Sequence, residues 1–203
     1  MIGPMISRRH LMLAGGAALG GCGIIPEVNE PIPLYTLSAV TQFDRSLPKA
    51  DWQLVIGTPV ASADLDTTRI ALTRSPGVVE YFAKGAWADN APILLQDKLI
   101  ESFEASGAIV AVGRDAVGLR PDYVLQSELR DFQAEFAGDA PSAHLRLVGK
   151  LVRMPDRRIV ANISIEQKVP AGGGSLPEIV DAFDRAASEA FQEVVVGVLT
   201  AQT

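Results

Sequence analysis

The sequence is poor in the residue types from which most catalytic and metal sites are built. Cys22 is the only cysteine, so no disulfide can form within the chain. His144 is the only histidine beyond the first 21 residues, and no carboxylate or cysteine stands at ligand spacing from it. No Gly-x-Ser-x-Gly pattern supports a Ser-His-Asp triad either. We therefore predict no catalytic residue, no metal and no cofactor, and we interpret His144 as a solvated residue on the polar face of a strand. Acidic residues are numerous, and a carboxylate pair brought together by folding stays open as an alternative.

Basic residues are outnumbered as well. The chain has 18 Lys and Arg against 24 Asp and Glu, a formal charge of −6. Removal of the first 21 residues takes away Arg8 and Arg9 and changes the charge to −8. Nucleic acid binding needs a basic face, so we predict no nucleic acid partner. An acidic domain is also repelled by anionic headgroups, and membrane attachment is therefore expected to be covalent.

No long hydrophobic run stands at the N-terminus. The apolar segment Leu11–Gly21 follows Arg8 and Arg9 and has eleven residues, which is too short to span a bilayer and typical of a secretory signal. It ends in Leu-Gly-Gly-Cys22, which resembles the bacterial lipobox. We predict that residues 1–21 are a signal peptide and that Cys22 is lipidated as the mature N-terminus; a cleaved signal with an incidental cysteine is the alternative. The Arg pair leaves both the Sec and the twin-arginine export routes open.

The segment after Cys22 predicts an extended tether. Residues 23–33 contain three prolines and show no hydrophobic periodicity. At full extension they reach roughly 35 to 40 Å, which would hold a folded domain clear of the lipid. Gly23 stands where lipoproteins retained in the inner membrane of enteric bacteria usually carry aspartate. By that resemblance, the protein is expected on the periplasmic face of the outer membrane.

What remains, residues 34–203, has the size and composition of one domain. Hydrophobic residues make up 48% of the chain and charged residues 21%, which is enough apolar material for a core. We predict an α/β fold in which two main helices pack on one face of a mixed β-sheet. The first helix is expected between Asn90 and Gly107, with capping side chains at Asp89 and Asn90 and a left-handed C-terminal cap at Gly107. Its apolar stripe is Pro92, Leu95, Leu99 and Phe103, with Ile93 and Ile100 beside it.

The second helix is predicted from Ser175 to about Leu199, and Ser175 and Glu178 have the spacing of a capping box. Its apolar stripe is unusually wide and comprises Ile179, Phe183, Ala186, Ala187, Ala190, Phe191, Val194, Val195 and Val198. We interpret the stripe as a face buried in the core, with a margin left for a partner as the alternative.

The strands are predicted from alternation and from turn residues. The segments are Leu34–Leu37 as an edge strand, Trp52–Val60, a hairpin of 69–74 and 78–82, Ala108–Val112 parallel to the Trp52 strand, and then three longer strands in a meander. In the first meander strand a bulge is expected before Phe132, because the phase of the alternation shifts there. In the third, Ile159, Ala161, Ile163 and Ile165 are expected on the inner face.

One stretch carries a family resemblance. Tyr81–Gly107 has an aromatic pair, then Trp-Ala-Asp, a proline, Leu-Leu-Gln and a helix that ends in Ser-Gly. This order resembles the auxiliary lipoproteins of ABC-type transport systems, a family that accompanies lipid-handling MCE transporters and includes the paraquat-inducible protein C. The resemblance extends from Leu34 to about Val198.

The resemblance implies a noncatalytic component that binds a periplasmic MCE protein and tethers it to the outer membrane. A regulatory lipoprotein that activates a periplasmic enzyme, such as a peptidoglycan synthase, is the alternative. Because MCE proteins form rings, a homo-oligomer is also expected. The candidate contact residues are Arg69, Arg74, Tyr81, Phe82 and Trp87, since arginine and aromatic side chains dominate interface energetics. For Trp87, an anchor in the core or in a turn is the alternative.

Overall fold

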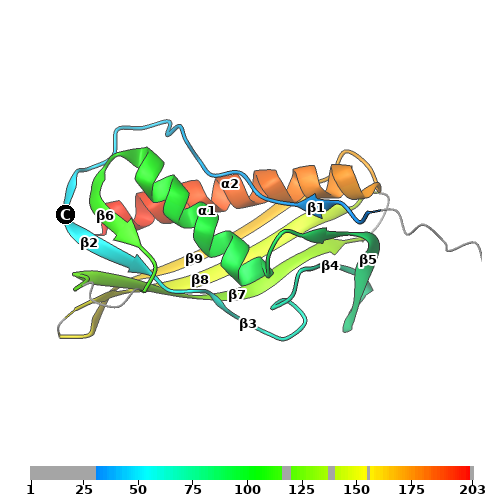
Figure 1. Cartoon of the computed structure of the whole chain (residues 1–203), viewed down its shortest axis with the longest axis horizontal. Helices are drawn as coiled ribbons and strands as arrows, with labels where there is room; N and C mark the ends of the chain where they lie inside the picture. Colours follow the sequence, from blue (N-terminus) through cyan, green and yellow to red (C-terminus); the bar gives the residue numbers. More distant parts are fainter. Residues whose placement is uncertain (1–30, 116–119, 137–139, 155, 202–203) are drawn as a thin grey trace, which may run out of the picture. The chain divides into compact units, whose positions relative to one another are not determined.

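The computed structural model describes residues 31–115, 120–136, 140–154 and 156–201. The signal peptide, Cys22 and nearly all of the tether lie outside the described residues. The elements are β1 (Leu34–Tyr35), β2 (Ala50–Ile56), β3 (Val60–Ala61), β4 (Arg69–Ser75), β5 (Val78–Trp87), α1 (Ala91–Ser106), β6 (Ile109–Gly113), β7 (Tyr123–Glu135), β8 (Ser142–Arg153), β9 (Arg158–Pro170) and α2 (Leu176–Thr200). They form one compact unit over Ile32–Thr203, in which both helices lie on the same face of a mixed sheet (Figure 1). The predicted fold class is confirmed.

β7 is the central strand of the sheet. Along one edge it pairs in parallel with three short segments in turn: β2 at Tyr123–Leu125, β3 at Glu128–Leu129 and β4 at Gln133–Glu135. Its other edge pairs with β8 in antiparallel register over nearly its whole length. The predicted strand Trp52–Val60 is therefore two strands, because the chain leaves β7 between β2 and β3 and returns to it. β6 pairs in parallel with β2, as expected.

The meander of β7, β8 and β9 carries two bulges. The first lies between Leu129 and Asp131, just before Phe132, as the alternation predicts. The second puts one extra residue, Val160, on β9 opposite the Leu151–Val152 step. Because a one-residue shift puts the side chains before and after it on opposite faces, Ile159, which precedes Val160, is out of phase with Ile163 and Ile165. Ile159 is 48% exposed, and its predicted inward position is wrong.

α1 buries the predicted stripe. Leu95, Leu99 and Phe103 are at most 3% exposed, and Gly107 has the left-handed conformation (φ 57°) expected of the C-terminal cap. The N-terminal cap differs from the prediction. The Asn90 side-chain amide donates to the Asp66 carboxylate at 2.9 Å instead of capping the helix, so Asn90 fastens the start of α1 to the loop before β4.

α2 is buried along its wide stripe, so the interpretation as a core face holds. Phe183 is fully buried and contacts Trp87 (ring centroids 5.4 Å apart) and Phe132 (4.7 Å), which joins α2 to β5 and β7. At the N-terminus of α2, the Glu178 carboxylate accepts hydrogen bonds from the backbone N–H and the hydroxyl of Ser175, as the capping-box spacing predicts.

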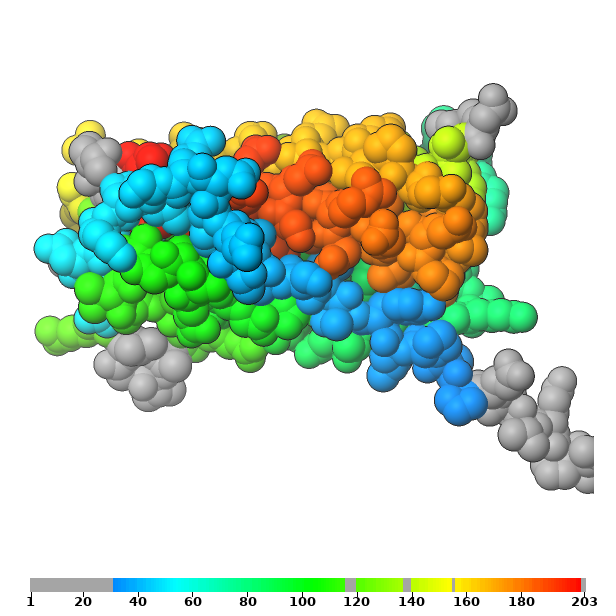
Figure 2. Space-filling model, turned by 90° about the horizontal axis from the view of Figure 1, so that it is seen from above, coloured from blue at the N-terminus to red at the C-terminus, as the bar shows by residue number. Residues whose placement is uncertain are grey.

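The segment between β1 and β2 crosses over the helices (Figure 2). The backbone N–H of Ser38 donates to the Asp184 carboxylate on α2 at 2.6 Å, and that of Val40 donates to the Ser102 hydroxyl on α1 at 2.9 Å. This strap closes the helix side of the domain. Within the described residues, neither helix is long and apolar enough to cross a membrane.

Candidate partner-binding surface

The β4–β5 hairpin carries four of the predicted contact residues, in two aromatic clusters. The two strands pair in antiparallel fashion around a turn in which Gly77 has φ 77°, a left-handed conformation that glycine adopts without strain. The hairpin bends because β5 has four residues, Phe82 to Gly85, opposite Ile70 alone on β4. Gly85 allows a close approach at the bend, since an added Cβ would lie 2.5 Å from Leu176 Cδ2 and 2.8 Å from Tyr35 Cε2.

Arg69 and Tyr81 form an exposed cation–π pair. The guanidinium carbon of Arg69 lies 3.5 Å from the centroid of the Tyr81 ring. The Tyr81 hydroxyl donates to the backbone carbonyl of Asp64 at 3.2 Å, which holds the ring in place beneath the arginine. The pair is therefore preorganised, with the arginine exposed to solvent and available to a partner.

A second aromatic cluster lies near the turn of the hairpin, where Arg74 and Phe82 both contact the ring of Phe136. Arg74 forms an ion pair with Glu80, and its guanidinium carbon lies 5.1 Å from the Phe136 ring centroid. Phe82 packs on the same Phe136 ring, with centroids 6.3 Å apart. Beside them is a shallow pocket of about 230 Å³ lined by Thr73, Arg74, Ser75, Pro76, Glu135 and Phe136. We call Arg69, Arg74, Tyr81, Phe82 and Phe136 the hairpin surface.

Trp87, the fifth predicted contact residue, lies in the core. It is the last residue of β5, is 1% exposed and stacks on Phe132 with ring centroids 5.3 Å apart. Its side chain points to the helix-covered face, so Trp87 is removed from the candidate surface.

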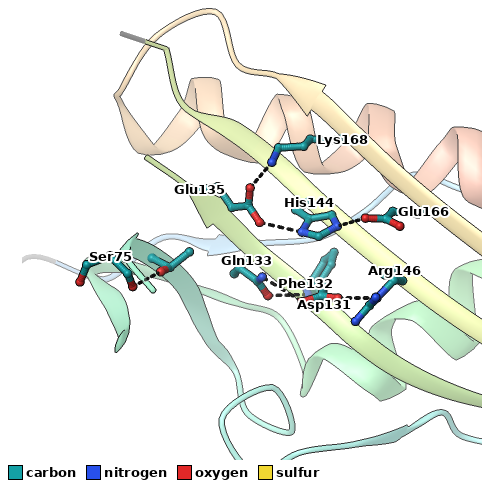
Figure 3. A network of polar contacts seen from close by, with 10 residues as sticks. Ser75, Asp131, Phe132, Gln133, Glu135, His144, Arg146, Glu166 and Lys168 are labelled. Atoms are coloured by element: carbon teal, nitrogen blue, oxygen red, sulfur yellow. Dashed lines mark hydrogen bonds and ion pairs between the residues drawn. The ribbon is translucent and has the colours of Figure 1, made fainter. Parts of the chain in front are cut away.

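His144 is not the solvated residue that the sequence suggests. Its side chain is 12% exposed and lies between two carboxylates: Nδ1 is 2.7 Å from Glu135 Oε1, and Nε2 is 2.9 Å from Glu166 Oε1 (Figure 3). Lys168 forms an ion pair with the other oxygen of Glu135. Both ring nitrogens can donate to ionised carboxylates only when the ring is doubly protonated. We call Glu135, His144, Glu166 and Lys168 the outer-face network, because it lies on the sheet face opposite the helices.

The network changes the acidity of Glu135. Partial burial raises the pKa of this carboxyl, but hydrogen bonds from Lys168 and His144 and the attraction of their charges outweigh burial, and the pKa is lowered from 4.5. Next to it, Arg146 Nε is 2.6 Å from Asp131 Oδ2, and Gln133 donates to the other Asp131 oxygen at 3.1 Å (Figure 3). Acidic side chains are thus paired with basic ones along the three long strands β7, β8 and β9.

The carboxylate pair left open by the sequence is found here, but it has the geometry of a structural network. Glu135 and Glu166 are joined through one histidine, and each is occupied by a cationic or imidazole partner. In the described part of the chain, no group of three or more His, Cys, Asp or Glu residues could hold a metal ion. The arrangement can bind the strands to one another and present charge; it does not place a nucleophile beside a base.

Sequence reasoning missed Phe136, Glu135, Glu166 and Lys168. Phe136 follows the end of β7, where its N–H donates to the Thr73 carbonyl at 2.9 Å and places its ring beside the hairpin. Lys168 is directly opposite His144 in the β8–β9 register. Only the strand register brings these residues together, and register depends on bulges whose positions were only partly evident from the sequence.

Comparison with known proteins agrees with this architecture. Residues 35–195 match the family described as ABC-type transport auxiliary lipoprotein component. Protein XCC0632 from Xanthomonas campestris, a DUF330 protein of known structure, is similar to the chain with 29% identity and a TM-score of 0.79, over 83% of this chain and 95% of that one. No significant match is found among curated proteins.

Two more distant structures share the fold. An uncharacterized protein has 12% identity and a TM-score of 0.61, over 79% of this chain and 97% of that one. The hypothetical protein CT253 from Chlamydia trachomatis has 8% identity and a TM-score of 0.51, over 74% of this chain and 99% of that one. At these identities the likeness concerns the fold alone.

Proposed function

Because the chain belongs to the family of ABC-type transport auxiliary lipoprotein components, we propose that it is a noncatalytic part of an MCE-type lipid transport system. In this proposal the domain binds the periplasmic MCE protein and tethers it to the outer membrane, while lipid moves through the partner. The ATP-driven step belongs to other components. This chain supplies attachment and recognition.

The attachment is Cys22. A lipidated cysteine with more than one acyl chain holds a protein stably on a membrane, whereas one chain is marginal. The acidic charge of the mature chain argues against an electrostatic alternative. Cys22→Ser is expected to leave an uncleaved or soluble product. A Cys22→Ser protein that still fractionates with the outer membrane after a high-salt wash would contradict the anchor.

The observation that carries the recognition step is the hairpin surface. It places two arginines against aromatic rings, one near the bend of the hairpin and one near its turn, where a shallow pocket lies beside it. Arginine and aromatic side chains are the commonest interface hot spots, and side chains held in place before binding lose less conformational entropy on association. The surface therefore fits a protein partner better than a small substrate.

Co-purification from membranes tests the proposal. Arg69→Glu keeps an exposed side chain but reverses its charge above Tyr81, and it should weaken recovery of the MCE protein about tenfold or more while the protein stays folded. Arg130→Glu is the matched control, because Arg130 is an exposed arginine paired with Glu128 and contacts no aromatic ring of the described residues. Recovery of a peptidoglycan synthase in place of an MCE protein would favour the regulatory alternative.

We also propose a homo-oligomer, since a ring-shaped partner is matched most simply by several copies of its tether. Light scattering of the purified mature protein in detergent measures this directly. A monomer at all concentrations, with and without the MCE protein, would contradict the oligomer but not the tether.

A further inference from the structure

β6 is an open edge of the sheet. Among the described residues it pairs only with β2. The Ala108 carbonyl accepts a hydrogen bond from the Ala50 N–H at 2.7 Å, so the backbone groups of Ala108 point toward β2. A register shift follows Ala50, and both backbone groups of Gln53 bond to Asp122. Ala111, which pairs with Gln53, therefore turns its backbone groups toward β2, and those of Ile109 and Val112 point away from β2. These groups can pair with another strand.

Apart from the register shift against β2, this edge lacks the features that usually protect one. Its sequence, Ile-Val-Ala-Val-Gly, has no charge and no proline, and Val110 is 70% exposed. The opposite edge strand, β9, carries Glu166, Lys168 and Pro170, and β1 is two residues long. Proteins normally protect edge strands with charges, proline or short length. An apolar edge without these features therefore indicates a site where a strand of another protein can pair with the sheet.

Two depressions lie beside β6. One, of about 180 Å³, is bordered by α1 and lined by Asp97, Ile100, Glu101, Glu104, Val112, Gly113 and Arg114. The other, of about 60 Å³, is lined by Gln53, Leu54, Val55, Ala111, Val112, Gly113 and Pro121, most of them from β2 and β6. A strand added to an edge alternates its side chains between the two faces of the sheet, and pockets next to the edge provide places for them.

The charge of the side chains beside α1 indicates which kind of segment could bind at this edge. Three carboxylates and one guanidinium line the larger depression, and Arg114 is already paired with Asp97. Glu101 is paired with Lys98, whereas Glu104 is exposed, and no ion pair is formed by it within the described residues. An incoming strand therefore meets excess negative charge on the α1 side of the edge.

We propose that the β6 edge is a docking site for an extended, basic segment of a partner protein, which adds to the sheet as a further strand. Its apolar residues would pack beside Val110 and Val112, and its basic residues would face Glu101 and Glu104. This site is separate from the hairpin surface and does not depend on the identity of the partner bound there.

Fluorescence anisotropy with labelled peptides tests the proposal on the mature protein. The probe is Lys-Val-Lys-Val-Lys-Val, which can pair and carries the required charge. Glu-Val-Glu-Val-Glu-Val reverses the charge, and Lys-Pro-Lys-Pro-Lys-Pro keeps the charge but cannot donate backbone hydrogen bonds. Saturable binding of the first peptide, at least about tenfold tighter than either control, is expected. Equal binding of the two lysine peptides would show attraction to an acidic protein only and would overturn the proposal.

Variants locate the binding. Val110→Lys places a charge on the edge and should weaken binding of the valine-lysine peptide about tenfold or more, and Glu104→Lys should weaken it severalfold. Val60→Lys is the matched control, since Val60 is also a strand valine with 70% exposure but lies on β3. All three should keep the thermal midpoint of wild type. Equal losses for Val110→Lys and Val60→Lys would place the binding elsewhere and end the proposal, as would no saturable binding by wild type.

Discussion

The two faces of the sheet use the same strands for different purposes. On the helix-covered face, Trp87, Phe132 and Phe183 pack together at no more than 1% exposure. On the opposite face, neighbouring residues of β7, β8 and β9 form the outer-face network of charges. Alternation along each strand separates apolar from polar side chains, so the first face stabilises the fold and the second can vary with little effect on it. In the proposed function, recognition belongs to the hairpin surface and not to either face of the sheet.

The largest expected effect is at the centre of the helix-covered face. Phe183→Ala should lower the free energy of unfolding by about 3 to 5 kcal/mol, and Leu99→Ala by about 2 to 5 kcal/mol, because each leaves a cavity in a fully packed core. Asp97→Ala, on the exposed side of α1, should cost well below 1 kcal/mol, as isolated surface ion pairs do. Urea unfolding measures all three. Equal losses for Leu99→Ala and Asp97→Ala would show that the orientation of α1 is misassigned.

A second comparison uses two glycines. Gly85→Ala puts a methyl group against Leu176 and Tyr35 and should destabilise the protein by about 1 to 3 kcal/mol. Gly197 lies inside α2, and among the described residues outside its own helix backbone an added Cβ there meets no atom within 4 Å. Gly197→Ala should therefore stabilise the protein by about 0.5 to 1 kcal/mol. Thermal midpoints that move in the same direction for both variants would contradict the close approach at Gly85.

The outer-face network should give a smaller, pH-dependent effect. The pKa of Glu135 is lower in the folded state than its ordinary value of 4.5, so the folded protein favours the ionised form. Its contribution to stability is present above about pH 4.5 and is lost as the pH falls through the folded pKa. Glu135→Gln should cost about 1 kcal/mol at pH 7 and less at about pH 3, where the ionised form is less populated. The same loss at both pH values would mean that charge is not what Glu135 contributes.

The smallest functional effect is expected at His144. His144→Ala leaves two carboxylates without their shared partner and should cost about 1 kcal/mol of stability. Resistance to membrane stress that depends on transport should remain at the wild-type level, because the proposed function needs no general base. Complementation of a deletion strain measures this. A folded His144→Ala protein without function would require an active site built on that residue.

Sequence periodicity predicted the elements that have one apolar face. The stripes of α1 and α2 and the bulge before Phe132 all follow from local spacing of apolar residues. The misplacement of Ile159 has a physical cause, since the Val160 bulge is set by pairing with β8 and leaves no local signal. The same limit explains the outer-face network, whose members lie on three strands. Trp87 was assigned to the surface because an aromatic residue before a turn suits both a core and an interface.

A binding titration tests most directly whether the hairpin surface binds the partner without contributing to the stability of the fold. Isothermal titration of the purified periplasmic MCE protein into the mature lipoprotein should compare wild type with Arg74→Glu, which places a negative charge beside Glu80 on the hairpin surface. We predict a loss of affinity of about tenfold or more with a thermal midpoint within about 2 °C of wild type. Unchanged affinity, or a loss that accompanies unfolding, would contradict the assignment of recognition to the hairpin surface.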